Sequence, residues 1–294
     1  MHPKQRLLAI AILTVLPLLS SQPAHATIAT PNQKQVIDRF IACSSFAPQF
    51  EQLPLLVREQ MERGFPQNIS STHYKNLSTL LLDSFEADRA RSAMSQQLSL
   101  SYDNGRFRVM LQKLESPLIR KLHDMEQAIN EPVARYEMQH FISRLPQNPV
   151  APQRTALVKE LLVTNGAIES ALKTRITLNE LVQELASGAT LEQNRTSLND
   201  VMEQKRKLTE SLKPKVEAET LAKALFTYRD ASDEELKQYI DFYKSDAGQW
   251  FRSTQQNGWL AALHEIGRDI AWKMQHPGSD DNVQKTALED DLEL

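Results

Sequence analysis

Apolar residues recur at the spacing of an α-helix along most of the chain, and this periodicity limits the possible folds more than any other feature. No stretch alternates apolar and polar residues as a half-buried strand does. The chain has only 8 glycines in 294 residues, well below the usual share of about 7%. The sequence therefore predicts an all-α fold. Three of the clearest stripes are Val36-Ile37-Phe40-Ile41, Leu157-Val158-Leu161-Leu162 and Leu178-Leu181-Val182-Leu185.

Local signals predict where several helices begin and end. Thr30 suits the N-cap of a first helix, with Pro31 at the first helical position and Gln33 to complete a capping box. Gly64 and Gly188 each follow an apolar stripe, at the place of a C-terminal glycine cap.

A proline-rich linker, residues 146–152, divides the chain, because Pro146, Pro149 and Pro152 prevent a helix from continuing through it. The two sides resemble each other: "VIDRFIACS" from Val36 matches "LVKELLVTN" 121 residues later in apolar character. "FRVMLQKLESPLIRKL" from Phe107 likewise matches "LKQYIDFYKSDAGQWF" 129 residues later. We therefore expect two tandem, similar helical-bundle repeats, over residues 27–145 and 153–277.

The segment "SDEELKQYIDFYKSDAGQWF", residues 232–251, is interpreted as a joint between two helices. Ser232 and Glu235 form a capping-box pattern, and Ser245 can cap a second helix that Asp246 also favours. Gly248 is expected to let a neighbouring helix come close, and Ser116-Pro117 is expected to act like Ser245 in the first repeat. The adjacent carboxylates and the clustered aromatic rings are interpreted as helix-starting charge and core, in preference to a metal site and a stacking surface.

This segment also resembles a known family. "LFTYRDASDEELKQYIDFYKSDAGQWF" is similar to the helical domain of bacterial exported proteins called domain-of-unknown-function family 2059, and "LVKELLVTNGAIESAL" resembles its opening helix. The likeness covers the second half well and the first half loosely, where Ile119 replaces the glycine. The resemblance implies an all-helical envelope protein of Gram-negative bacteria. It brings no known activity, cofactor or catalytic residue.

The N-terminus predicts export. Residues 1–26 have a basic start, a mostly apolar run too short to span a bilayer and an Ala24-His25-Ala26 end, which is the pattern of a secretory signal peptide cleaved after Ala26. A periplasmic or secreted protein without a transmembrane segment in its mature chain is expected. Residues 278–294 are strongly acidic and predict a disordered tail.

Charge and motifs argue against several functions. The formal charge is −3 for the full chain and −5 for the tail alone, and the remainder of the mature chain is neutral without a basic stripe for nucleic acid. "HEIGR" from His264 has Arg268 where a zinc protease needs its second histidine, and "SALK" from Ser170 lacks the other elements of a penicillin-binding site. The single cysteine, Cys43, is interpreted as a small buried residue, with a reactive or dimer-forming thiol as the alternative. We predict no catalytic residue, no metal site and no cofactor.

Two functions remain open from the sequence. The first is a non-enzymatic binding or interaction module of the cell envelope, with a protein, a peptide or an apolar ligand held in a groove between the repeats. The second is an envelope hydrolase with an unrecognised site. Convergent carboxylates or histidines in a deep pocket would favour the enzyme, and an apolar groove between the halves would favour binding.

Overall fold

The computed structural model describes residues 31–44, 47–64, 71–188 and 198–276, which form helices α1–α12 and no strand. The predicted all-α fold is confirmed. The helices are α1 (Pro31–Ala42), α2 (Ala47–Gly64), α3 (Ser71–Ser84), α4 (Ala87–Leu100), α5 (Asn104–Leu114), α6 (Pro117–Ala128), α7 (Pro132–Arg144), α8 (Pro152–Thr164), α9 (Ala167–Gly188), α10 (Leu198–Thr227), α11 (Asp233–Lys244) and α12 (Asp246–Gln275). The predicted signal peptide, Thr30 and the acidic tail lie outside the described residues.

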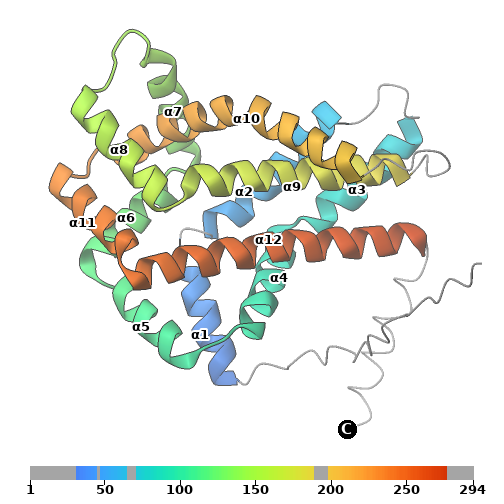
Figure 1. The fold of residues 1–294 in the computed structure, drawn as a ribbon, viewed down its shortest axis with the longest axis horizontal. Coiled ribbons are helices and arrows are strands. Elements are labelled where there is room, and N and C mark those ends of the chain that lie inside the picture. Colours follow the sequence, from blue (N-terminus) through green and yellow to red (C-terminus); the bar gives the residue numbers. More distant parts are fainter. Residues whose placement is uncertain (1–30, 45–46, 65–70, 189–197, 277–294) are drawn as a thin grey trace, which may run out of the picture.

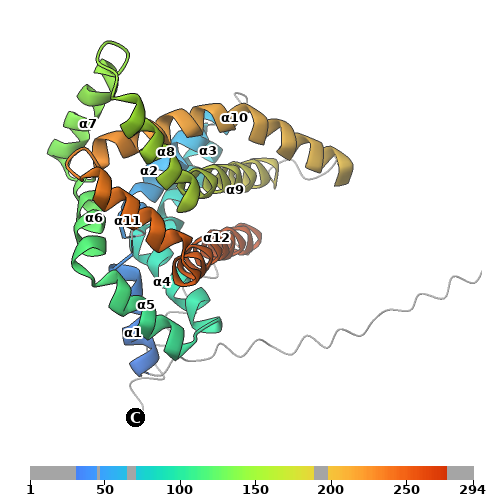
Figure 2. The same ribbon diagram turned by 60° about the vertical axis from the view of Figure 1, so that its left-hand side comes forward.

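Three long helices give the molecule its main axis: α9, α10 and α12 lie side by side, with α10 returning along α9 (Figures 1 and 2). The shorter helices α5, α6, α8 and α11 gather at one end of them. Helix α4 crosses and packs against α12, and α2 packs against α9. The segments before and after the proline-rich linker are therefore in extensive contact.

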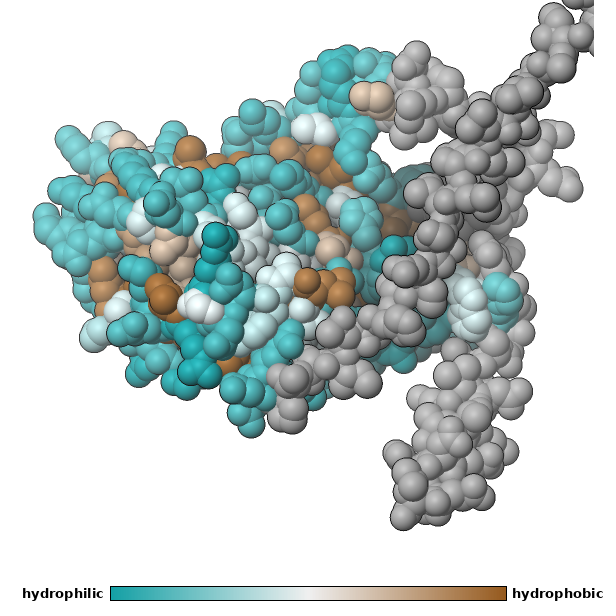
Figure 3. Space-filling view, turned by 60° about the horizontal axis from the view of Figure 1, so that its bottom comes forward, coloured by the Kyte–Doolittle hydropathy of each residue, from teal (hydrophilic) through white to brown (hydrophobic). Residues whose placement is uncertain are grey.

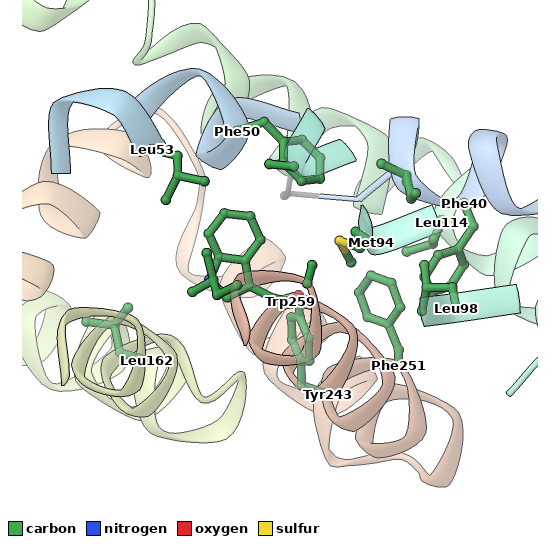
Figure 4. Packing of buried hydrophobic residues seen from close by; sticks show 14 of the residues in the cluster. Phe40, Phe50, Leu53, Met94, Leu98, Leu114, Leu162, Tyr243, Phe251 and Trp259 are labelled. Atoms are coloured by element: carbon green, nitrogen blue, oxygen red, sulfur yellow. The ribbon is translucent and has the colours of Figure 1, made fainter. Parts of the chain in front are cut away.

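Aromatic side chains from both segments form the centre of the core. The ring of Phe40 on α1 lies 4.8 Å from that of Phe107 on α5 and 5.5 Å from that of Phe251 on α12. The rings of Phe50 on α2 and Trp259 on α12 are also 5.5 Å apart (Figure 4). All five side chains are almost wholly buried, and burial of large apolar surface is the main force that stabilises a fold.

Several helix contacts recur along the chain, although the described residues form seven helices before the linker and five after it. Helix α1 packs on α4 and α5 as α8 packs on α10 and α11, and α2 packs on α6 as α9 packs on α12. The helix bounds recur at the offsets expected from the sequence, with starts at Pro31 and Pro152, at Asn104 and Asp233, and at Pro117 and Asp246, and ends at Gly64 and Gly188. These correspondences support the predicted repeat. That the two halves superpose stays a prediction.

The joint at residues 232–248 has the predicted local structure. Ser232 and Glu235 form a complete capping box at the start of α11, and Ser245 Oγ accepts from the backbone N–H of Gly248 at the start of α12. A Cβ atom added to Gly248 would lie only 2.0 Å from the carbonyl oxygen of Phe242, so α11 and α12 meet too closely for a side chain there. Glycine at this position is therefore required by close packing.

The acidic start of α11 is held by basic side chains from other helices. Asp233 pairs with Arg154 Nη1 at 2.5 Å, and Glu235 pairs with Lys121 of α6 at 2.6 Å. The Lys121 bond, with the backbone N–H of Ser232, lowers the pKa of the Glu235 carboxyl. Arg154 Nη2 also donates to the carbonyl oxygens of Tyr228 and Ala231. These carboxylates thus begin a helix and pair with cations.

One local expectation was wrong. Ser116 occupies the N-cap of α6 with extended backbone and Pro117 follows it, but the Ser116 side chain makes no capping hydrogen bond. Pro117 has no N–H, so the first turn of α6 has one fewer free backbone donor. Asp103 provides the side-chain cap in this half, since it accepts from the backbone N–H of Arg106 at the start of α5.

Candidate functional site

A cavity of about 460 Å³ lies between the two halves of the chain. Helices α2, α6 and α7 of the first half and α8 to α12 of the second contribute to its lining. Its volume falls in the usual range of sites for small molecules, about 300–1,000 Å³. The cavity is partly enclosed and its walls are mainly apolar, with Leu56, Ile129, Met138, Ile142 and Leu162 among them.

The carboxylate of Glu126 organises the polar end of this cavity. Its Oε1 atom accepts from the hydroxyl of Tyr228 at 2.6 Å and from the hydroxyl of Tyr239 at 3.0 Å. Tyr243 lies next in this chain of hydroxyl groups, with its oxygen 3.3 Å from that of Tyr239. Burial, reinforced by the charge of Glu126, raises the pKa of both Tyr228 and Tyr239. These phenols therefore remain protonated donors at neutral pH.

Lys223 of α10 brings a cation to the same end. Its side chain is largely buried, and Nζ lies 3.4 Å from Oε1 of Gln52 on α2. Burial lowers the pKa of the Lys223 ammonium, and the negative charge of Glu126 opposes that shift. A buried ammonium needs strong acceptors, because desolvation penalises its charge.

A second cation, Arg175 of α9, also lines the cavity. It binds α10 at a residue one helical turn before Lys223. Its Nη2 atom binds Oε2 of Glu219 at 2.5 Å, and Glu219 precedes Lys223 by four residues on α10, so the two share a face of that helix. The other terminal nitrogen of Arg175, Nη1, is buried and has no hydrogen-bond partner among the described residues. Buried polar atoms without partners are uncommon and call for an explanation.

Trp259 of α12 and Thr174 of α9 form part of the opposite wall. The indole N–H of Trp259 donates to Oγ1 of Thr174 at 2.9 Å, and Thr174 donates in turn to the carbonyl oxygen of Ser170. This bond satisfies the polar atom of a ring that is otherwise packed in the core (Figure 4). This side of the cavity is therefore held by core packing and by a side-chain hydrogen bond.

The residues singled out from sequence motifs do not form a catalytic site. His264 and Arg268 are exposed on α12, and Lys173 pairs with Glu169 at 2.8 Å on the outside of α9. Ser170 does line the cavity, but in the described part of the chain its hydroxyl has no hydrogen bond to a base. Cys43 is half-buried against the core, and burial raises the pKa of its thiol.

The predicted aromatic segment is mainly core. Tyr239, Tyr243, Phe251 and Trp259 are all buried, as expected from their helical spacing. Tyr243 and Trp259 also line the cavity, a second role that the periodicity could not indicate. Glu126, Lys223 and Arg175 were missed altogether, because each is an isolated charged residue within a helix and no local pattern marks it.

Other parts of the surface are weaker candidates for a binding site than this cavity. A larger depression of about 770 Å³ between α4 and α12 is more open, and its lining includes the charged pair Asp269 and Lys273. The face in Figure 3 is mainly hydrophilic, with hydrophobic residues scattered over it.

Within the described residues, no group of three or more His, Cys, Asp or Glu side chains could hold a metal ion. None of the described helices is long and apolar enough to cross a membrane.

Comparison with protein-family models, with curated proteins and with solved structures found no significant match to the chain. The fold and the cavity thus define the class: an all-α protein with a ligand-sized cavity lined from both sides of the proline-rich linker. The resemblance to domain-of-unknown-function family 2059 stays a prediction.

Proposed function

We propose that the protein is a non-enzymatic binding module of the bacterial cell envelope, which holds a small, mainly apolar molecule in the cavity between its two halves. The observation that carries the proposal is the cavity itself: about 460 Å³, lined from both halves, with a surface that is mainly apolar and with polar side chains, Glu126, Arg175 and Lys223 among them. Apolar walls with a few fixed polar groups are typical of small-molecule sites. The signal-like residues 1–26 support an envelope location.

The chemistry of the lining favours binding over hydrolysis. No histidine lines the cavity, and its two carboxylates, Glu126 and Glu219, are engaged by tyrosine hydroxyls and by Arg175. A nucleophilic serine needs a base within hydrogen-bond reach, which Ser170 lacks in the described residues. The polar groups here are arranged to orient a ligand and not to activate a nucleophile.

A cavity-filling substitution tests this proposal. Ala171 of α9 lines the cavity, so Ala171→Trp should fill it, whereas Ala156→Trp on the exposed side of α8 adds the same ring outside it. We expect the neutral dye N-phenyl-1-naphthylamine to bind the wild type saturably, with an affinity that Ala171→Trp lowers at least tenfold and Ala156→Trp leaves unchanged. Circular dichroism checks that both variants fold. Absent saturable binding, or equal binding by all three proteins, would overturn the proposal.

A further inference from the structure

The polar end of the cavity has hydrogen-bond donors that no described residue accepts. The ammonium of Lys223 carries three N–H groups, and in the described part of the chain its one hydrogen bond is the long contact of 3.4 Å to Gln52. The guanidinium of Arg175 uses Nη2 for Glu219, while Nη1 is buried without a partner. Two cations thus offer unused donors to the same space.

These two cations are linked through one face of α10. Arg175 binds Glu219, and Glu219 and Lys223 are four residues apart on α10, which is one helical turn or about 6 Å of rise. Both Arg175 and Lys223 line the cavity. An anionic group with two acceptor atoms, such as a planar carboxylate, is the class of ligand that takes donors from both cations.

The two carboxylates of the lining, Glu126 and Glu219, do not take up the remaining donors of Lys223 and Arg175. Glu126 Oε1 already receives two tyrosine hydroxyls, and Glu219 is bound by Arg175 and lies 3.7 Å from Lys215. What the cavity lacks is one further acceptor. A monoanion supplies it, whereas a dianion such as a phosphate monoester would bring more charge close to the two carboxylates already present.

The rest of the lining indicates what the anion is attached to. Leu56, Ile129, Met138, Ile142 and Leu162 form apolar walls on the helices that face α9 and α10. Apolar surface of this kind stabilises a hydrocarbon chain by burying it, at about 25 cal/mol per Å². Building on the proposed function, we infer that the ligand is a carboxylic acid with an apolar chain, whose carboxylate lies between Lys223 and Arg175.

Calorimetry with three probes of equal chain length tests the inference: decanoate, 1-decanol and decylamine. Decanoate should bind at least tenfold more tightly than 1-decanol, since hydrogen bonds to charged groups are stronger than those between neutral groups, and decylamine should bind most weakly. Lys223→Met should reduce the affinity for decanoate at least tenfold and leave that for 1-decanol unchanged. Lys237→Met removes an exposed lysine of α11 and serves as the matched control.

Each outcome decides something. Equal binding of decanoate and 1-decanol, or equal losses for both in Lys223→Met, would overturn the inference. No heat from decanoate would overturn it too. In either case the proposed function still stands if Ala171→Trp blocks the neutral dye, so the two failures are distinguishable.

Discussion

The hydroxyl of Tyr228 donates to Oε1 of Glu126 over 2.6 Å and thereby joins the two halves of the chain at the polar end of the cavity. Glu126 belongs to α6, and Tyr228 directly follows α10. Tyr239 of α11 donates to the same oxygen. One carboxylate therefore fixes three segments of the fold and one face of the candidate site.

This relationship predicts the effect of removing one hydroxyl. Tyr228→Phe deletes a buried hydrogen bond to a charged acceptor and should lower the free energy of unfolding by about 1.5–3 kcal/mol. Tyr136→Phe, at a residue whose side chain is 72% exposed, should change it by less than about 0.5 kcal/mol. Urea denaturation of the two variants measures both values. Equal stability of the two variants would contradict the role given to Glu126.

Lys223 predicts a pH-dependent stability. Burial lowers its pKa below the ordinary lysine value of 10.5, so between these two values the unfolded chain binds more protons than the native one. By linkage, Lys223 costs stability at neutral pH, and the cost is relieved as the pH rises from the lowered pKa to 10.5.

Lys223→Met should therefore be more stable than the wild type at pH 7, because the cost of burying the ammonium is removed. Its advantage should shrink as the pH approaches 10.5. Thermal melts of both proteins across this range measure the difference. A variant that is less stable at pH 7 would show that the ammonium is better paired than its contacts indicate.

Gly248 predicts a strong steric effect at the joint of α11 and α12. An added Cβ would meet the Phe242 carbonyl oxygen at 2.0 Å and the Cα of Tyr243 at 2.7 Å, and backbone atoms cannot move aside cheaply. Gly248→Ala should thus cost about 3 kcal/mol, more than the roughly 1 kcal/mol for loss of the Ser245 cap in Ser245→Ala.

Gly105→Ala is the matched control for this prediction. It lies near the start of α5, where an added Cβ would meet only the side chain of Asp103, at 3.3 Å. Its melting temperature should stay close to that of the wild type. If Gly248→Ala melts like Gly105→Ala, close helix approach is not the reason for glycine at the joint.

Export predicts the N-terminus of the mature chain. The Ala24-His25-Ala26 sequence fits a signal peptidase, so the exported protein should begin at Thr27. Mass spectrometry of the periplasmic fraction measures this end directly. A mature chain that still carries Leu7 to Leu19 would contradict the assignment.

Local structure was predictable because its causes are local. The capping box of Ser232 and Glu235, the Ser245 cap and the start of α8 at Pro152 each depend on residues within one turn of one another. The prolines inside helices show the limit of such rules: Pro54 and Pro214 lie within α2 and α10. Packing of the flanking turns outweighs the hydrogen bond that each proline removes.

The cavity could not be predicted, because its groups meet only after folding. Tyr228 and Glu126 are 102 residues apart, and Lys223 and Gln52 are 171 apart. The sequence matches even conceal the site: Tyr239 and Tyr243 correspond at an offset of 129 to Met110 and Leu114, which are buried core residues in the first half. A pattern of apolar positions treats these residues alike, whereas only the tyrosines bring a hydroxyl group.

Crystals grown with 10-bromodecanoate measure the position of a bound ligand directly, because the bromine marks the end of its chain. The carboxylate should lie within hydrogen-bond distance of Lys223 Nζ and Arg175 Nη1. The bromine should lie among the apolar side chains of Ile129, Met138 and Ile142. A bromine bound only on the outer surface, or a chain reversed so that bromine lies beside Lys223, would contradict the account.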